Sequence, residues 1–212
     1  MTSNKEPRQK RKPSRIAQER RRDLIDGAIR NIAAVGYDAV TIATICEEAG
    51  FSRGLIGHYF TSKDALLLEA VKSVAHDLGE AIRTATQMAG ADPAARLHAL
   101  VKASFTPPGF TPEKVAVWVS LTGSARWSSP LTEVYTQIWQ EYREGVGRLF
   151  EKAAKQTGVD LDARLTTITF SHLVEGLWVG WAADPTSITP SLAQACCHNY
   201  VDTVLGRSRS GE

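Results

Sequence analysis

Apolar residues recur at helical spacing along most of the chain. In the N-terminal part this repeat runs from Leu24 to Ile32, and Gly36 follows as an expected helix terminator. Beyond Gly90 the pattern predicts five longer helices, over residues 93–105, 113–126, 130–157, 161–183 and 190–205. No stretch combines strict alternation, β-branched residues and hairpin turns, so no strands are expected. The pattern therefore predicts an all-α protein.

Three shorter helices are predicted between the first helix and residue 82. Each follows a hydroxyl residue suited to cap a helix N-terminus, namely Thr41, Ser52 and Ser62. The first is expected to end at Gly50 and to have an inner face made of Ile42, Ile45 and Ala49. The last carries apolar residues from Ala65 through Val71 and runs toward Ile82. These segments predict a compact N-terminal unit of three or four short helices.

The helix predicted over residues 52–59 contains Gly54 and Gly57. A glycine in a helix interior costs about 1 kcal/mol relative to alanine, so two in one short helix need an explanation. A short helix, a turn at Gly50 and a second short helix form a helix-turn-helix, whose second helix enters the DNA major groove. The two glycines would let the backbone approach DNA. An ordinary helical hairpin with a glycine-softened turn is the alternative.

The residues around this turn resemble the signature of the TetR family of transcriptional regulators. They include Ala49-Gly50-Phe51-Ser52-Arg53-Gly54, His58-Tyr59-Phe60 and Ser62-Lys63-Asp64-Ala65-Leu66, and the spacing matches without gaps from Ile45 to Leu66. Cys46 and Phe51 replace the family's usual alanine and valine, and Gly57 stands where an aromatic residue is common. The resemblance implies a DNA-binding dimer with a C-terminal ligand-binding bundle, and a protein that is not an enzyme.

The resemblance also implies which residues contact DNA: Thr41, Ser52, Arg53, Gly54, His58, Tyr59 and Lys63. Hydroxyl groups and the lysine suit phosphate oxygens, whereas only Arg53 has the fork that suits guanine O6 and N7. Alternatives remain at three positions. Arg53 could bind phosphate, His58 could be buried beneath the fold, and Lys63 could form a salt link with a nearby acid.

Charge is unevenly distributed along the chain. Residues 1–22 hold nine basic and two acidic side chains, a charge of +7, and the remaining residues hold 16 basic and 21 acidic ones, a charge of −5. Such an arm suits an anionic partner, although it could equally be a solvated tail. Residues 23–81 carry four basic and nine acidic groups. DNA binding is therefore expected to depend on the arm and a few placed contacts.

These features predict a division of the chain. Residues 1–14 are expected to be a disordered basic arm, 15–81 the DNA-binding domain, 82–206 the ligand-binding and dimerisation domain, and 207–212 a disordered tail. The three cysteines, two of them adjacent, indicate reduced thiols and a cytoplasmic protein. No metal or cofactor motif and no apolar run of 18 residues occurs, so neither a cofactor nor a membrane partner is expected.

Aromatic residues in the C-terminal half suggest a ligand pocket. Tyr135, Trp139 and Tyr142 share one helix face, and Glu175 lies one turn before Trp178. Such a stripe could simply be core or dimer packing. Glu175, however, stands in an apolar helix and needs a partner, which could be His172, a residue across a dimer or a ligand cation.

The segments around Ser52–Phe60, Val117–Trp118, Ser128–Leu131 and Glu175–Trp178 resemble betaine-pathway (BetI-type) repressors within the family. The resemblance implies choline or a related quaternary amine as inducer. Ring faces and a carboxylate suit such a cation, so we expect it to lie between Trp118, Trp139 or Tyr142, Glu175 and Trp178. A neutral or aromatic ligand is the alternative. The long loop at Ser187–Pro190 and the basic arm depart from that type.

Three functional classes are compared. The leading hypothesis is a ligand-responsive repressor that binds palindromic operator DNA as a homodimer. An all-α enzyme would need a site around His172 and Glu175, but the chain has only one reversed Glu/His pair and no nucleotide or triad motif. A ligand-independent architectural DNA-binding protein is the third class, and the absence of an aromatic cavity would favour it.

Overall fold

The computed structural model describes residues 14–207, which form nine α-helices and no strand. The helices are α1 Arg15–Val35, α2 Ile42–Ala49, α3 Arg53–Tyr59, α4 Lys63–Met88, α5 Pro93–Ser104, α6 Pro112–Ala125, α7 Ser129–Thr157, α8 Ala163–Ala183 and α9 Pro190–Val204. The predicted all-α class is confirmed. Of the arm expected at residues 1–14 and the tail expected at 207–212, residues 1–13 and 208–212 lie outside the described range.

Helix starts follow capping chemistry. Seven caps accept a hydrogen bond from a first-turn N–H through their side chain: Ser14, Thr41, Ser62, Asp92, Thr111, Asp162 and Thr189. Thr41 forms a reciprocal capping box with Thr44. Ser52 precedes α3 in the cap position but makes no side-chain cap hydrogen bond. Its hydroxyl is therefore not used to hold α3.

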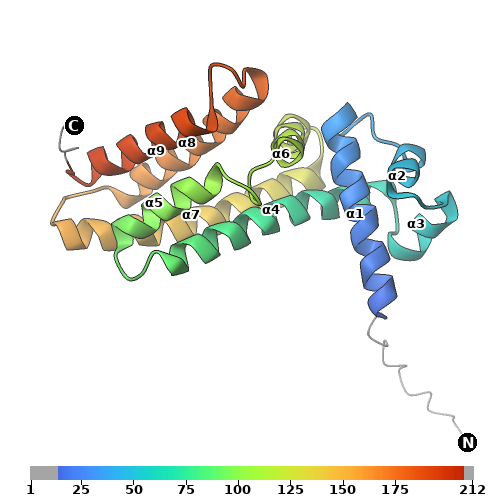
Figure 1. The fold of residues 1–212 in the computed structure, drawn as a ribbon, viewed down its shortest axis with the longest axis horizontal. Coiled ribbons are helices and arrows are strands. Elements are labelled where there is room, and N and C mark those ends of the chain that lie inside the picture. Colours follow the sequence, from blue (N-terminus) through green and yellow to red (C-terminus); the bar gives the residue numbers. More distant parts are fainter. Residues whose placement is uncertain (1–13, 208–212) are drawn as a thin grey trace, which may run out of the picture.

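The N-terminal unit packs α1 against α2, with α3 beyond them (Figure 1). Gly27 allows the close approach of α1 and α2, because a Cβ there would lie 3.0 Å from the Ala49 side chain. Ile45 and Ile56 are buried as predicted. The prediction that Ile42 belongs to the inner face is wrong, since it is 36% exposed and Cys46 is buried instead. In the eight-residue helix α2, the buried side chains are those of Ile45 and Cys46.

Helix α4 is 26 residues long and joins the N-terminal unit to the bundle (Figure 1). It is not the short helix expected, and it runs beyond Ile82 to Met88 because nothing before Ala89 and Gly90 interrupts its amphipathic pattern. It packs against α1 at its start and against α5, α6 and α7 further along. One continuous helix therefore contacts both parts of the protein.

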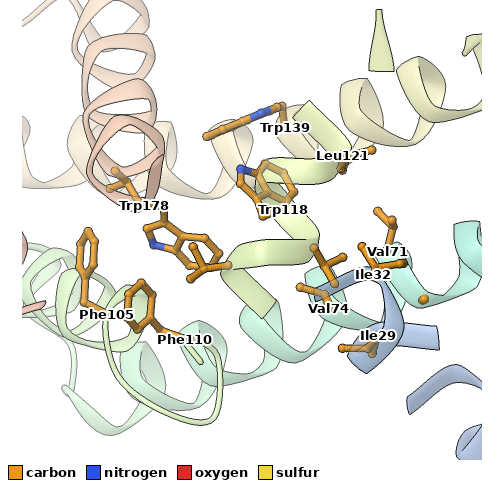
Figure 2. Packing of buried hydrophobic residues seen from close by; sticks show 14 of the residues in the cluster. Ile29, Ile32, Val71, Val74, Phe105, Phe110, Trp118, Leu121, Trp139 and Trp178 are labelled. Carbon is orange, nitrogen blue, oxygen red and sulfur yellow. The ribbon is translucent and has the colours of Figure 1, made fainter. Parts of the chain in front are cut away.

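The C-terminal bundle is built around a continuous apolar core. Figure 2 shows Trp118 of α6 lying between Trp139 of α7 and Trp178 of α8. The ring centroids of Trp118 and Trp139 are 5.9 Å apart, and those of Trp118 and Trp178 are 6.5 Å apart, both edge-to-face. Trp127, in contrast, is 82% exposed at the turn between α6 and α7. Four of the five tryptophans thus pack inside the bundle or against it.

Candidate DNA-reading face and ligand cavity

The turn between α2 and α3 has helix-turn-helix geometry. Gly50 has a φ of 71°, in the left-handed region that favours glycine, and so ends α2. The N–H of Phe51 donates to the carbonyl of Cys46 at 2.9 Å, which closes the turn. Ile45 and Ile56 then bury their side chains on the inner side of the two helices. The opposite side of α3 faces solvent.

Polar groups gather on that outer side. Ser52, Arg53 and His58 are exposed, while Tyr59 is partly buried. The alternative that His58 is buried beneath the fold is therefore excluded for the free protein. A Cβ added at Gly54 or Gly57 would meet open space, and neither glycine has a positive φ. Neither intramolecular packing nor backbone conformation requires these glycines, although each costs helix stability.

The two remaining residues at expected DNA contacts lie at the edges of this unit. Thr41 is exposed, and its hydroxyl accepts a hydrogen bond from Thr44 N at 3.1 Å. Lys63 donates from Nζ to the carbonyl of Val40 at 3.0 Å. An ammonium group has three donors, so two remain after this bond. Lys63 therefore holds the loop before α2 whether or not it also meets DNA.

Helix α1 is tied to the neighbouring helices by arginines. Arg21 donates to Glu69 of α4 at 2.6 Å, and its guanidinium lies 5.0 Å from the Phe60 ring centroid. The Arg21 bond holds the pKa of Glu69 below its usual value. Arg30 pairs with Glu48 of α2 at 2.5 Å. These bonds hold α1 against α4 and α2 against α1. The helices that carry α3 are therefore fixed relative to the bundle.

All five residues predicted to hold a ligand line one cavity of about 830 Å³ in the bundle: Trp118, Trp139, Tyr142, Glu175 and Trp178. Its walls come from α4, α5, α6, α7 and α8. Trp139 Nε1 and Tyr142 Oη are buried and have no hydrogen-bond partner among the described residues. Burial raises the pKa of Tyr142, so its hydroxyl stays protonated. The cavity thus offers rings and one carboxylate, while these two polar atoms lie buried in its wall.

Glu175 is held by two hydrogen-bond partners. Tyr135 donates to its Oε1 at 3.0 Å, and His172 Nδ1 donates to its Oε2 at 3.0 Å. Burial, followed by the Glu175 charge, raises the pKa of Tyr135 to about 12, so the phenol remains a donor. The Glu175 side chain is only 11% exposed. His172 is the one basic side chain that pairs with it among the described residues, and no lysine or arginine does so.

The tryptophans differ in how they are fixed. Trp178 donates from Nε1 to the carbonyl of Ser104 at 2.9 Å, so it also ties α8 to α5. Trp139 has no such bond, and the guanidinium of Arg143 lies 5.7 Å from its ring centroid. The Trp139 ring therefore already has one cation within the range of a cation–π contact.

Sequence reasoning missed several members of this site. Tyr135 was placed on the correct helix face but not assigned to Glu175, because a pairing 40 residues apart depends on how α7 meets α8. The apolar wall contributed by α4, which includes Val74, Leu78 and Ile82, was also missed. Their spacing of four residues is visible in the sequence, but it does not show that this face of α4 lines a cavity with α7.

A second, smaller cavity of about 240 Å³ lies where the two parts of the chain meet. Tyr37, Asp38, Asp64 and Trp127 are among its lining residues. Ser124 of α6 donates to Asp38 at 3.4 Å, next to the C-terminal end of α1. Burial and these two acids raise the pKa of Tyr37 to about 12. Helix α6 therefore contacts the N-terminal unit as well as the main cavity.

Comparison with known families agrees with both parts of this architecture. Residues 24–70 match the family model described as bacterial regulatory proteins, tetR family. Residues 93–206, more than half of the chain, match the BetI-type transcriptional repressor C-terminal model. Among the described residues, no helix is long and apolar enough to cross a membrane.

Individual relatives show the same pattern. The HTH-type transcriptional regulator BetI of Burkholderia lata is 28% identical over 88% of this chain and 94% of its own length. The protein of the same name from Paraburkholderia phytofirmans is 27% identical over 88% of this chain and 93% of its own. These relatives are transcriptional regulators and not enzymes, which supports the expectation of a non-enzymatic protein.

Solved structures share the fold. A transcriptional regulator from Pseudomonas aeruginosa PAO1 superposes with a TM-score of 0.80 at 29% identity, covering 89% of this chain and 91% of that one. A transcriptional regulator from Saccharomonospora viridis, in complex with choline, superposes with a TM-score of 0.77 at 24% identity, covering 87% and 96%. The helix-turn-helix, the bundle and both family matches agree, and the chain belongs to the TetR family of transcriptional regulators, with a BetI-type C-terminal domain.

Proposed function

We propose that this protein is a homodimeric repressor that binds pseudo-palindromic operator DNA and is released by a small organic cation such as choline. The observation that carries this proposal is helix α4. Its first residue, Lys63, braces the DNA-reading unit, and its middle turns line the cavity that contains Glu175. A single rigid element therefore connects the two sites. The cavity favours this function over a ligand-independent architectural role.

The DNA-reading role rests on the outer side of α3. Two helical glycines with open space beside them are explained if the α3 backbone lies against something outside the chain. We propose that this is the major groove, with Arg53 on a base edge, and with Ser52, His58 and Tyr59 on phosphates or bases. Thr41 and Lys63 would contact phosphates at the edges, and Gly54 would allow close approach. The basic residues of the arm would supply further phosphate contacts.

Dimerisation is supported by apolar side chains that the single chain leaves exposed. Leu165 is 63% exposed and Ile168 is 38% exposed on α8, and Leu192 is exposed on α9. Leu165, Ile168, His172 and Val179 are spaced three, four and seven residues apart, so they form one stripe along α8. Homodimers are typical of the family. We propose that α8 and α9 form a four-helix interface with the same helices of a second copy.

The cationic inducer is supported by the surroundings of Glu175. A quaternary ammonium group cannot donate hydrogen bonds, so a protein binds it through ring faces and a nearby anion. Trp118, Trp139 and Trp178 provide rings, and Glu175 provides an anion that no lysine or arginine pairs with among the described residues. The choline complex of the Saccharomonospora viridis regulator, which shares this fold, is consistent with the same chemistry.

We also propose the division of the chain into an arm at residues 1–14, a DNA-binding domain at 15–81, a ligand-binding and dimerisation domain at 82–206, and a tail at 207–212. The boundary at residue 82 falls inside α4. It therefore divides the DNA-binding role from the ligand-binding role within one continuous helix. A bacterial regulator of this kind would act in the cytoplasm, where the chromosome is. Ligand would change the spacing of the two α3 helices through α4.

The test is operator release measured by fluorescence anisotropy. An operator is first selected from a DNA library with the full chain, and choline is then titrated into the complex. We expect release at micromolar to millimolar choline, and none with 3,3-dimethyl-1-butanol, the uncharged carbon isostere of choline. Equal release by the isostere would contradict a cationic inducer. Failure to select any DNA would contradict the operator-binding role itself.

A further inference from the structure

The main cavity is much larger than choline. Choline has seven heavy atoms, and even at about 30 Å³ for each, the volume of a water molecule in the liquid, it would fill about 210 Å³. The cavity measures about 830 Å³, which is within the usual range for drug-sized ligands. Most of the space is therefore left over once a small quaternary amine is placed beside Glu175.

The remaining space is an apolar corridor between α4 and α7. Val74, Leu78 and Ile82 of α4 line the cavity at intervals of four residues. On α7 the lining continues past Trp139 through Tyr142 to Leu149. At 1.5 Å per residue, the stretch from Trp139 to Leu149 extends about 15 Å along the helix axis. The corridor is thus long enough for a hydrocarbon chain that starts beside the tryptophans.

Two helical glycines keep this corridor open. Gly79 of α4 and Gly145 of α7 both line the cavity, and a Cβ at either would meet no atom within 4 Å. Neither has a positive φ, so backbone conformation does not require glycine there. Glycine lowers helix stability at both positions. A ligand that needs the space explains why it is left unfilled.

The exposed rim of the corridor carries charged side chains that are largely paired within their own helices, apart from Glu141, which accepts a hydrogen bond from Gln137. Three basic side chains there are paired with an acid of their own helix: Lys72 with Glu69, Arg83 with Glu80, and Arg148 with Glu144. The three basic side chains are well exposed to solvent, with exposed fractions of 53% for Lys72, 55% for Arg83 and 66% for Arg148. The one enclosed charge in the cavity is therefore Glu175, at the aromatic end, among the described residues.

We propose that the inducer is an amphiphilic cation, with an amine head against Glu175 and the tryptophans and an uncharged hydrocarbon chain in the corridor between α4 and α7. This inference rests on the proposed cationic inducer and adds a chain to it. Choline itself would occupy only the head site and would bind as a fragment of the full ligand. Burial of the chain supplies the rest of the affinity.

Isothermal titration calorimetry with alkyltrimethylammonium salts tests the proposal. The full-length protein is titrated with choline and with methyl, butyl, hexyl and octyl members of the series, all below micelle formation. We expect affinity to rise about fourfold for each methylene that enters the corridor. Octanoate, which has a similar chain and an anionic head, is expected to bind far more weakly than octyltrimethylammonium.

A variant that fills the corridor isolates the chain site. Gly145→Leu is expected to fold, because leucine is a better helix former than glycine. Its side chain would occupy the corridor, so the ratio of octyl to choline affinity should fall close to one. Gly123→Leu is the matched control, because Gly123 is also a helical glycine with open space beside it but does not line the cavity. It should keep the ratio of the unmodified protein.

The outcomes separate the two proposals. If choline binds but chain length adds no affinity, or if Gly145→Leu leaves the ratio unchanged, the amphiphilic inducer is overturned and the cationic inducer stands. If octanoate binds as tightly as octyltrimethylammonium, the cationic head is overturned. If neither choline nor any member of the series binds, the cationic inducer of the proposed function fails together with the chain.

Discussion

Lys63 donates a hydrogen bond from Nζ to the carbonyl oxygen of Val40 at 3.0 Å, and so joins the first turn of α4 to the residue before the α2 cap. Val40 is almost completely buried. A buried carbonyl that loses its partner costs about 1–3 kcal/mol. The bond therefore couples the position of the helix-turn-helix to the start of the helix that lines the ligand cavity.

Replacing Lys63 should lower stability. We expect Lys63→Met to reduce the free energy of unfolding by about 1–3 kcal/mol, because it leaves the Val40 carbonyl without its donor. Urea denaturation followed by circular dichroism measures the change. Lys72→Met is the control, since the 53% exposed Lys72 pairs with Glu69 alone among the described residues and should change stability by about 0.5 kcal/mol or less. If both variants lowered the free energy of unfolding equally, the bond from Lys63 to the Val40 carbonyl would not stabilise the protein in the way proposed.

The same variant also tests the phosphate contact proposed for Lys63. A phosphate contact predicts that Lys63→Met weakens binding to all DNA sequences alike and lowers the salt slope by about one. The free donors of the ammonium group make this contact compatible with the Val40 bond. An unchanged salt slope would mean that Lys63 acts only by holding the loop before α2.

Arg53 is expected to carry sequence preference. It is exposed at the first position of α3, and its fork suits a guanine edge. The unmodified protein should discriminate between the operator and a DNA variant in which the contacted guanine is replaced. Arg53→Ala should reduce this discrimination by about 1–3 kcal/mol. Ser52→Ala serves as the comparison, because loss of a phosphate donor should weaken both DNAs equally. Retained discrimination in Arg53→Ala would show that Arg53 binds a phosphate instead.

The basic arm is expected to account for much of the salt dependence of DNA binding. Residues 1–13 carry five basic side chains and one acidic one. Each phosphate they neutralise contributes about 0.9 to the slope of log affinity against log salt. Deleting residues 1–13 should therefore flatten the slope. Ser14 is kept in this truncation because its hydroxyl caps α1 by accepting from Ala17 N at 3.2 Å.

A charge-neutral arm is the matched control for this deletion. In it, the five basic residues are changed to glutamine, which preserves the length of the arm and removes its positive charge. We expect the same flattened slope as for the deletion. A full slope in either protein would exclude phosphate contacts by the arm.

The exposed stripe on α8 should be needed for dimerisation. Ile168→Glu places a charge within the proposed interface, where it would be buried without a partner. We expect a monomer at micromolar concentration in sedimentation equilibrium, whereas the unmodified chain should be a dimer. Met88→Glu, at an exposed position at the end of α4, should stay dimeric. A monomeric unmodified chain would contradict the proposed assembly.

The sequence was sufficient for features that depend on local physics. Helical periodicity, hydroxyl caps and Gly50 predicted the helices and the helix-turn-helix, because each is determined by neighbours within a few residues. The same reasoning placed the rings and Glu175 on helices that meet. Sequence reasoning failed for Ile42, because the exposure of this side chain depends on how the short helix α2 packs on α1. It also failed for the end of α4, where no breaker coincides with the expected boundary.

Long-range pairings could not be predicted in the same way. The bonds from Tyr135 to Glu175, from Trp178 to Ser104 and from Lys63 to Val40 depend on the packing angles of whole helices. The corridor beside Gly145 is likewise a property of the distance between α4 and α7. A glycine in the sequence shows that a side chain is missing, but only the assembled bundle shows that the resulting space is empty.

The head site should depend on both charge and rings, and the variants can separate the two. Glu175→Gln keeps the size of the side chain and an acceptor for Tyr135 but removes the negative charge. We expect choline affinity, measured by calorimetry, to fall about tenfold or more, which corresponds to at least about 1.4 kcal/mol. Affinity for the uncharged isostere should stay the same. Equal affinity of Glu175→Gln for choline would show that the carboxylate is only structural.

Trp139 and Trp178 should respond differently because only one of them holds the backbone. Trp139→Leu removes a ring without breaking a hydrogen bond, so choline affinity should fall by up to about 2 kcal/mol through the lost cation–π contact. Trp178→Phe keeps a ring but leaves the Ser104 carbonyl without its donor, so it should cost about 1–3 kcal/mol of unfolding free energy. Its choline affinity should change less than that of Trp139→Leu, because phenylalanine still presents a ring face. The reverse order of choline affinities would mean that Trp139 belongs to the core and that the ammonium group does not lie against it.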